Sequence, residues 1–349
     1  MVPVELVLSF IFLLVVLGSA LVSALLILGL KPLLVRYAMA RPNARSSHTI
    51  PTPQGGGIAV IGACLLMPIG LMLTGSVPPT AFTVLVIATV TLAVVGAVDD
   101  IRPLPAVPRL LLQVGAVAAI VVTSGVRVLP EAVPLVVEQA FLVLGGVWFV
   151  NLVNFMDGLD WITVAEMVPV TAAIAPLYVL ATKSLPAEAI VPEVNYVAAA
   201  LCGALLGFAP FNKPVARLFL GDVGSLPIGL LVGWMLLQLA GAGGLAAAIL
   251  LPLYYLMDAT ITLLRRLRRG EKVWEAHRSH FYQKATDNGF SALNVSAHVF
   301  GLNLVLAGLA TITLVWPSGT VQIAALAAGI VLVGLVLRRF SQARLEFSR

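Results

Sequence analysis

The stretch that decides the fold is residues 4–30, VELVLSFIFLLVVLGSALVSALLILGL, in which Glu5 is the one charged residue. A helix that crosses a bilayer core of about 30 Å needs about 20 mainly apolar residues, and this run exceeds that length. It is also longer than the apolar core of a cleaved signal peptide, and no Lys or Arg precedes it. We therefore expect a retained membrane-spanning helix.

The whole chain has the same character. Of its 349 residues, 60% are hydrophobic and 11% are charged, and its mean hydropathy is +1.04. Soluble domains average about 45–50% apolar and about 25% charged residues, so this composition excludes a soluble globular protein, a disordered chain and a coiled coil. The runs do not alternate polar and apolar residues, which argues against a β-barrel. We expect an all-α polytopic integral membrane protein.

Apolar runs predict eleven spans. After residues 4–30 they occupy residues 56–74, 80–98, 106–123, 135–153, 163–181, 194–210, 225–240, 245–264, 297–316 and 320–337. With the N-terminus periplasmic, every Lys and Arg except Arg127 and Lys183 falls on an inner segment, as the positive-inside rule requires. The C-terminus is then cytoplasmic. We expect one catalytic domain, residues 1–349, whose cytoplasmic active-site loops are residues 31–55, 99–109, 154–163, 211–225 and 265–296.

Aspartates from three distant segments fall at this cytoplasmic face: Asp99, Asp100, Asp157, Asp160 and Asp222. Ionised side chains near lipid are expensive and commonly mark functional cavities. Acids at cytoplasmic helix ends also run against the basic trend of that face. A shared acidic site is therefore favoured over separate solvated helix ends.

Two stretches add detail to the expected site. Asn151, Asn154 and Asp157 fall on one helical face, which Asp160 would share if the helix continued. Such a polar stripe is expected to line a cavity. Asp222 stands between glycines, and Ser225 could cap the following helix, whose N-terminus would favour a phosphate.

The residue types favour a hard cation. Cys64 and Cys202 lie far apart in apolar stretches, and no Cys or His cluster has zinc-binding spacing. Carboxylates suit Mg²⁺, which takes one or two of them together with water and substrate phosphates. Basic segments 41–57 and 265–284 flank the acids, and the second carries a His-Arg-Ser-His sequence that can bind phosphate or sugar oxygens. We expect metal-assisted chemistry on a phosphorylated substrate and no nucleic-acid partner.

Together these motifs resemble one family, the polyprenyl-phosphate N-acetylhexosamine-1-phosphate transferases of glycosyltransferase family 4, which start lipid-linked glycan synthesis in bacteria. The matching stretches follow the family's order over most of the chain. They are the Arg-Pro-Asn-Ala-Arg-Ser-Ser-His and Pro-Thr-Pro-Gln-Gly-Gly-Gly loop at 41–57, Ala-Val-Asp-Asp at 97–100, Asn-Leu-Val-Asn-Phe-Met-Asp-Gly-Leu-Asp at 151–160, Phe-Leu-Gly-Asp-Val-Gly-Ser at 219–225 and His-Arg-Ser-His at 277–280.

The resemblance implies a reaction and roles. A polyprenyl phosphate in the bilayer attacks the β-phosphorus of a UDP-N-acetylhexosamine, UMP leaves, and Mg²⁺ assists, with Mn²⁺ as an alternative. Asp222 carries over as a metal ligand, and Asp99 and Asp100 carry over to the lipid phosphate or the metal. Catalytic roles around the nucleotide and sugar carry over to Asp157 and Asp160. Substrate-binding roles carry over to Asn151 and Asn154 around the nucleotide and sugar, and to Asn212 and Phe219 near the uracil. Further substrate-binding roles carry over to His277, Arg278 and His280 near the diphosphate and sugar, and to Arg45 and Thr52 in the first loop.

Two departures bear on specificity. Trp161 stands where the family commonly has Gly, which adds bulk beside Asp160. The sequence His-Arg-Ser-His replaces the consecutive histidines of the muramoyl-pentapeptide branch, so the chain looks more like the branch that starts O-antigen or other surface polysaccharides at the bacterial inner membrane. The sugar stays open among GlcNAc, GalNAc, FucNAc and QuiNAc.

Other interpretations are weaker. A transporter of an anionic sugar nucleotide or lipid-linked sugar would place acids near the midplane, where Asp258 is the one firm candidate. Asp258 could instead pair with a cation, line the cavity or hold a helix break after Pro252. An Asp-Asp-x-x-Asp prenyltransferase motif fails at Pro103. Gly- and Ala-rich faces at 241–248 and 324–329 could pack helices within or between subunits, so a homodimer is left open.

Overall fold

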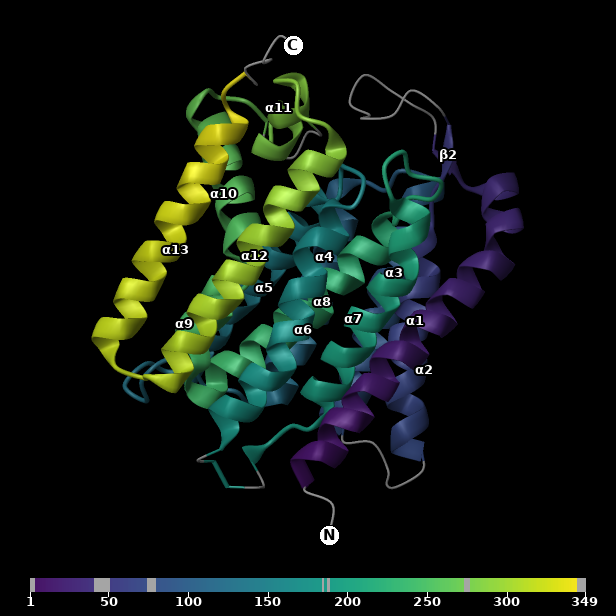
Figure 1. Ribbon diagram of the computed structural model, residues 1–349. Coiled ribbons are helices and arrows are strands. Elements are labelled where there is room, and N and C mark those ends of the chain that lie inside the picture. Colours follow the sequence, from purple (N-terminus) through teal and green to yellow (C-terminus); the bar gives the residue numbers. More distant parts are fainter. Residues whose placement is uncertain are drawn as a thin grey trace.

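The computed structural model describes residues 4–40, 51–73, 80–183, 185–186, 189–272 and 277–343. These residues form a helical bundle with one small pair of strands (Figure 1). In order the elements are α1 Val4–Tyr37, β1 Met39–Ala40, β2 Thr52–Pro53, α2 Gly56–Leu73, α3 Thr80–Ile101, α4 Ala106–Ser124, α5 Leu135–Met156, α6 Ile162–Thr182, α7 Glu193–Asn212, α8 Asp222–Leu239, the π-helical turn Ala240–Gly244, α9 Leu245–Leu250, α10 Leu253–Arg268, α11 Phe281–Asp287, α12 Ala292–Val315 and α13 Gly319–Phe340.

The all-α polytopic fold is confirmed. Within the described part of the chain, nine helical segments are long and apolar enough to cross a membrane, counting α8 to α9 as one segment. The predicted span 56–74 corresponds to α2, which is one of the shorter helices and is not counted among the nine. The predicted span 245–264 is not one continuous helix, because the chain breaks after Leu250 into α9 and α10. Pro252 sits at this break, where it lacks an N–H and caps the start of α10.

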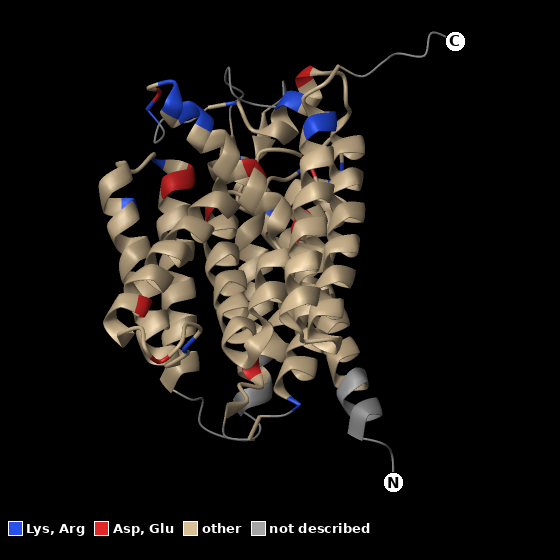
Figure 2. Ribbon diagram, turned by 90° about the vertical axis from the view of Figure 1, so that its left-hand side faces the viewer, with Lys and Arg blue, Asp and Glu red and all other residues tan. Residues whose placement is uncertain are grey.

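The helix is kinked between α8 and α9. Gly243 has φ +88°, a left-handed conformation that glycine adopts without steric cost. The two chain ends lie at opposite ends of the bundle (Figure 1). Lys and Arg gather at the end that carries the C-terminus, with few at the other end (Figure 2). This is the charge asymmetry that the positive-inside argument predicts.

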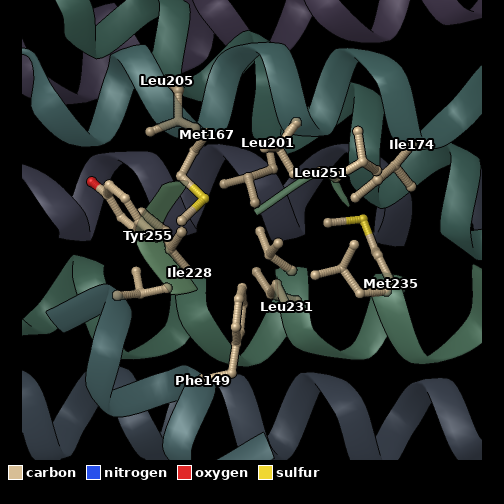
Figure 3. Close-up of a cluster of buried hydrophobic side chains, with 14 of the residues drawn as sticks. Phe149, Met167, Ile174, Leu201, Leu205, Ile228, Leu231, Met235, Leu251 and Tyr255 are labelled. Carbon is tan, nitrogen blue, oxygen red and sulfur yellow. The ribbon is translucent and has the colours of Figure 1, made fainter. Parts of the chain in front are cut away.

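Helix α8 is the buried centre of the bundle. Its side chains meet those of α5, α6, α7 and α10 in an apolar cluster that includes Phe149, Met167, Leu201, Leu231 and Tyr255 (Figure 3). Small residues allow helices to approach closely in membranes, where burial in lipid gives little driving force of its own. Gly203 and Gly207 of α7 do this against α1, because a Cβ at either position would collide with the α1 backbone.

A short strand pair ties the first loop to the start of α8. β1 and β2 are antiparallel, and the backbone of Pro53 accepts a hydrogen bond from the Phe219 N–H at 2.9 Å. The Gly56 N–H in turn donates to the Phe219 carbonyl at 2.9 Å. The two loop segments, more than 160 residues apart in the chain, are therefore held side by side at the beginning of α8.

Candidate functional site

Three of the predicted acids meet at one end of the bundle. Asp99 and Asp100 end α3, and Asp222 begins α8. Arg109 of α4 reaches between them, with Nη1 2.6 Å from Asp99 Oδ2 and 3.8 Å from Asp222 Oδ2. The Asp99 and Asp222 carboxyl groups also lie within hydrogen-bonding reach of each other. Like charges this close need a cation or a proton between them, and the Arg109 guanidinium supplies positive charge at this point.

Asp100 holds the start of α8. Its carboxylate accepts the N–H groups of Asp222 at 2.9 Å and Val223 at 3.1 Å. Gly221 makes this approach possible, since its φ is +78° and a Cβ there would lie 2.5 Å from Asp100 Oδ2. The expectation that Ser225 caps this helix is wrong, because a carboxylate from α3 takes that place and complements the positive end of the helix.

Asn154 connects α5 to the same point. Its Nδ2 donates to Asp222 Oδ1 at 2.8 Å and to Ser225 Oγ at 2.9 Å. Asp222 is thus held by an amide on one oxygen, while its other oxygen faces the Arg109 guanidinium. The side chains of Asp99 and Asp222 retain 11% and 28% exposure, which leaves Asp222 the more accessible of the two.

The predicted polar stripe on α5 divides. Asn151 does not reach the acids, because its Nδ2 donates to Gln113 Oε1 of α4 at 2.6 Å and to the Val147 carbonyl at 2.8 Å. Helix α5 ends at Met156, so Asp157 and Asp160 lie in the following turn and do not share a helical face.

Asp157 is held by the start of α6. Its Oδ1 accepts the Thr163 hydroxyl at 2.5 Å, and that hydroxyl lies 3.5 Å from the Tyr255 hydroxyl. Burial raises the pKa of Asp157 to about 7, which the Thr163 hydrogen bond opposes and the negative charge of Asp100 reinforces. A carboxyl group with this pKa exchanges protons near neutral pH.

Asp160 and Asn212 organise the loop before α8. Asp160 is 5% exposed and accepts the Ala216 N–H at 3.0 Å. Asn212 accepts the Trp161 N–H at 2.8 Å and donates to the Leu218 carbonyl at 2.9 Å. Their side chains therefore bind backbone, and their predicted catalytic and uracil-binding roles stay predictions. Phe219 is half-buried beside this loop.

The backbone at Trp161 adopts a conformation that favours glycine, which is the residue that the resembling family commonly has at this position. Its φ is +63°, the one left-handed conformation of a non-glycine residue within the described ranges. Its N–H is bound by Asn212, and its indole Nε1 donates to the Ala209 carbonyl at 2.6 Å. The indole therefore hydrogen-bonds to α7 at its Nε1.

The His-Arg-Ser-His sequence packs on α10. The rings of His277 and His280 stack with centroids 4.7 Å apart, and His277 Nδ1 lies 2.8 Å from Ser279 Oγ. Arg278 Nη2 contacts Thr286 Oγ1 at 3.2 Å and Asp287 Oδ1 at 3.1 Å. Its Nε is buried without a hydrogen-bond partner among the described residues.

Asp258 fixes this segment. Its carboxylate is fully buried and accepts the N–H groups of Phe281 at 2.9 Å and Tyr282 at 3.1 Å, at the start of α11. It also accepts the Tyr254 hydroxyl at 3.1 Å, and His280 Nδ1 lies 3.3 Å away. The sequence left three roles open for Asp258, and these contacts show a different one, a helix cap beside His280.

The segment lies against the acid-bearing loops. The Tyr282 hydroxyl donates to the Phe155 carbonyl at 3.2 Å, and a Cβ on Gly158 would collide with that hydroxyl. Thr52 is buried in β2, on the loop that also contacts Phe219. Arg45 lies outside the described residues. The predicted site residues thus share one end of the bundle but form several hydrogen-bonded groups rather than one cluster.

Comparisons with known proteins agree with this arrangement. The model for glycosyl transferase family 4 matches residues 82–240, which include Asp99, Asp100, Asn154 and Asp222. Over these residues the chain is similar to glycosyl transferase family 4.

Similar relatives cover most of this transferase. They include the decaprenyl-phosphate N-acetylglucosaminephosphotransferase of Mycobacterium tuberculosis, 27% identical over 86% of this chain and 83% of that protein. A probable undecaprenyl-phosphate N-acetylglucosaminyl 1-phosphate transferase of Bacillus subtilis is 25% identical over 84% and 85%. A phospho-N-acetylmuramoyl-pentapeptide-transferase of Synechococcus sp. is 29% identical over 84% and 88%. Relatives named for transfer of N-acetylglucosamine phosphate and of phospho-N-acetylmuramoyl-pentapeptide are therefore similar to this chain to a comparable degree.

The donor set of this transferase fits Mg²⁺ in part. The described residues hold no group of three or more His, Cys, Asp or Glu arranged around one metal position. Mg²⁺ does not require one, since it binds through one or two carboxylates with water and substrate phosphates. Asp222 and Asp99 offer such a pair. Asp100 is the weaker ligand, because both of its oxygens already accept backbone N–H groups.

Sequence reasoning did not assign roles to three residues of this site. Arg109 is one of the cations on the inner segments, and its position ten residues after Asp99 is the available signal. Thr163 follows Asp157 by six residues but contacts it through a turn rather than a helix. Asp258 stood out as a charge within an apolar run, although the backbone N–H groups that it accepts lie more than 20 residues further along the chain.

Proposed function

We propose that this transferase moves an N-acetylhexosamine-1-phosphate from a UDP-sugar to a polyprenyl phosphate in the bilayer and releases UMP. The observation that carries the proposal is the convergence of Asp99, Asp222, Arg109 and Asn154 where α3, α4, α5 and α8 meet. The relatives named for decaprenyl and undecaprenyl phosphate support the acceptor, and those named for N-acetylglucosamine make UDP-GlcNAc the first donor to test.

The reaction is a single displacement at phosphorus. An oxygen of the acceptor phosphate forms a bond to the β-phosphorus of the donor, and the bond from that phosphorus to the oxygen of UMP breaks. A phosphomonoester has its second pKa near 6, so the acceptor is already mostly a dianion at neutral pH. The protein's contribution is then positioning and charge neutralisation, as is usual for phosphoryl transfer.

The residues divide this work. Asp222 would be the main ligand of Mg²⁺, which would supply charge neutralisation of the phosphates, and Asp99 lies beside it as a second candidate ligand or as a base for the acceptor phosphate. Asp100 and Gly221 fix the α8 backbone that carries Asp222, and Asn154 orients its carboxylate. His277, Arg278 and His280 supply N–H donors on the adjoining segment, where the unpartnered Arg278 Nε is available to a phosphate oxygen. The gathering of Lys and Arg at this end supports a cytoplasmic site, where UDP-sugars are found (Figure 2).

A UMP-release assay tests the proposal. Purified protein in detergent is given undecaprenyl phosphate, Mg²⁺ and a panel of UDP-GlcNAc, UDP-GalNAc, UDP-FucNAc, UDP-QuiNAc and UDP-MurNAc-pentapeptide. We expect UMP that requires both lipid and Mg²⁺ with one donor, and loss of that signal in Asp222→Ala. Failure of folded protein to release UMP from every donor would contradict the proposal, and donor movement across vesicles without UMP would favour a transporter.

The same assay separates metal binding from proton transfer. At pH 8 we expect Asp222→Asn to lose more activity than Asp99→Asn, because the acceptor needs little help from a base when it is already a dianion. Titration of Mg²⁺ provides the second measurement, since loss of a ligand raises the concentration needed for half-maximal rate. Equal losses in the two variants would instead make Asp99 an essential metal ligand.

A further inference from the structure

Gln113 of α4 carries a buried donor without a partner. The side chain is fully buried, and its Nε2 has no hydrogen-bond partner among the described residues. Its Oε1 accepts the Asn151 Nδ2 at 2.6 Å, and Asn151 is itself anchored to the Val147 carbonyl at 2.8 Å. The amide is therefore held by its oxygen with its N–H group uncommitted. A buried polar group in this state costs free energy unless a ligand satisfies it.

The amide lies between the acids and an apolar cavity. Arg109, Gln113 and Val117 are four residues apart and so share one face of α4. Arg109 binds Asp99, whereas Val117 lines a cavity of about 220 Å³ between α4, α5, α8 and α10. The same order holds on α5, where Asn154 binds Asp222 and Val150 lines the cavity.

The cavity is suited to a hydrocarbon. It is lined almost wholly by apolar side chains and by Gly145, Gly146, Gly229 and Gly233, which leave room between the helices. Along α4 and α5 the order is therefore the same: residues that bind the carboxylates, then the Gln113–Asn151 amide pair, then residues that line an apolar cavity. A molecule with a charged head and an apolar chain matches this sequence of surroundings.

We propose that the Gln113 Nε2–H donates to a lipid-side oxygen of the acceptor's phosphate, with Asn151 as the positioning residue that holds the amide. This inference rests on the proposed function. The acceptor joins a phosphate directly to an apolar chain, whereas the nucleotide sugar is water-soluble and arrives from outside the bilayer. A neutral donor also contacts phosphate without cancelling the charge on the acids that bind the cation.

Gln113→Leu tests the proposal. Leucine has a similar volume and removes the unpartnered N–H, so we expect the Tm without ligand to stay level or rise. We expect the KM for undecaprenyl phosphate to increase about tenfold or more, as for loss of a hydrogen bond to a charged group. The KM for the UDP-sugar should not change. The matched control is Gln238→Leu, which removes a buried amide near the far end of α8.

The outcomes separate this inference from the proposed function. If wild-type protein releases no UMP, the proposed function is overturned. The Gln113 amide is then tested by whether undecaprenyl phosphate raises the Tm of wild type more than that of Gln113→Leu. An unchanged KM for the lipid in Gln113→Leu overturns the inference. An equal rise in KM for both substrates, or the same rise in the lipid KM in Gln238→Leu, would show a structural role and would also overturn the inference. If Gln113→Leu does not fold, Gln113→Met takes its place in every arm.

Discussion

Helices α8 and α11 both begin against an aspartate from another helix, but in different surroundings. Asp100 binds the first N–H groups of α8 beside two more carboxyl groups, at a half-buried position. Asp258 binds those of α11 among tyrosines, with no exposed surface. The first start carries Asp222 to the acid site, and the second carries His280. An aspartate in a functional motif can thus serve by placing a helix rather than by touching substrate.

The largest effect should come from removing the more enclosed cap. In Asp258→Ala the N–H groups of Phe281 and Tyr282 lose their acceptor, and each buried donor left unpaired costs about 1–3 kcal/mol. We expect a lower Tm in detergent and loss of UMP release. The control is Tyr254→Phe, which removes one of the donors to Asp258 and should shift the Tm much less. A Tm equal to that of wild type would show that α11 does not depend on this carboxylate.

A smaller effect on folding, but a clear one on activity, is expected at the α8 start. In Asp100→Asn an amide NH₂ must face one of two backbone N–H groups, which displaces the backbone of Asp222. We expect kcat/KM to fall about 10- to 100-fold with the Tm reduced less than in Asp258→Ala. Gly221→Ala should give a similar loss, because its φ of +78° and the nearby Asp100 oxygen leave no room for a methyl group.

The Asp100→Asn and Gly221→Ala variants also distinguish a helix cap from a metal ligand. A cap variant should lower kcat/KM at every Mg²⁺ concentration, since the displaced backbone is not restored by more metal. A ligand variant should recover part of its activity as Mg²⁺ is raised. Recovery of Asp100→Asn at high Mg²⁺ would return Asp100 to the metal-binding role that the family pattern implies.

The contrast between these starts shows what sequence can and cannot predict. Apolar runs and the positions of Lys and Arg predicted the fold, because whether a segment spans the membrane depends on that segment's own length and charge. The break at Pro252 was not predicted, because the apolar run 245–264 continues across it. The caps depend on contacts across 122 residues for Asp100 and 23 residues for Asp258, and no local pattern encodes such a pairing. Motif resemblance brought the acids to one site but did not separate Asn151 from Asn154.

The start of α6 offers a pH-dependent test. Thr163→Val removes the hydrogen bond that lowers the pKa of Asp157, so the pKa should rise further above about 7. If catalysis uses the ionised carboxylate, the acid limb of the profile of kcat/KM against pH moves to higher pH. Thr171→Val is the matched control, because that hydroxyl donates to the Met167 and Val168 carbonyls of α6 and does not contact Asp157. Superimposable profiles would show that ionisation of Asp157 does not limit the rate.

The Tm should also depend on the ionisation of Asp157. The pKa of Asp157 is higher in the folded protein than its ordinary value of 3.8, so the folded state holds the extra proton between about pH 4 and pH 7. The Tm contribution of this residue therefore falls as pH rises through that window and is level above it. In Thr163→Val the decline should extend to higher pH, and in Asp157→Asn it should disappear.

The smallest effect is expected at Trp161, the residue before α6. Two features oppose each other there, since the φ of +63° costs an ordinary residue about 1–2 kcal/mol while the indole gains a hydrogen bond to α7. Trp161→Gly relieves the first and loses the second, so the Tm should fall only slightly. Trp161→Ala loses the hydrogen bond and keeps most of the strain, and we expect it to be about 1 kcal/mol less stable than Trp161→Gly. Activity within about twofold of wild type in the glycine variant would mean that tryptophan is a local replacement for the family's glycine, whereas an altered order of donors in the UMP assay would show that the indole also shapes the sugar site.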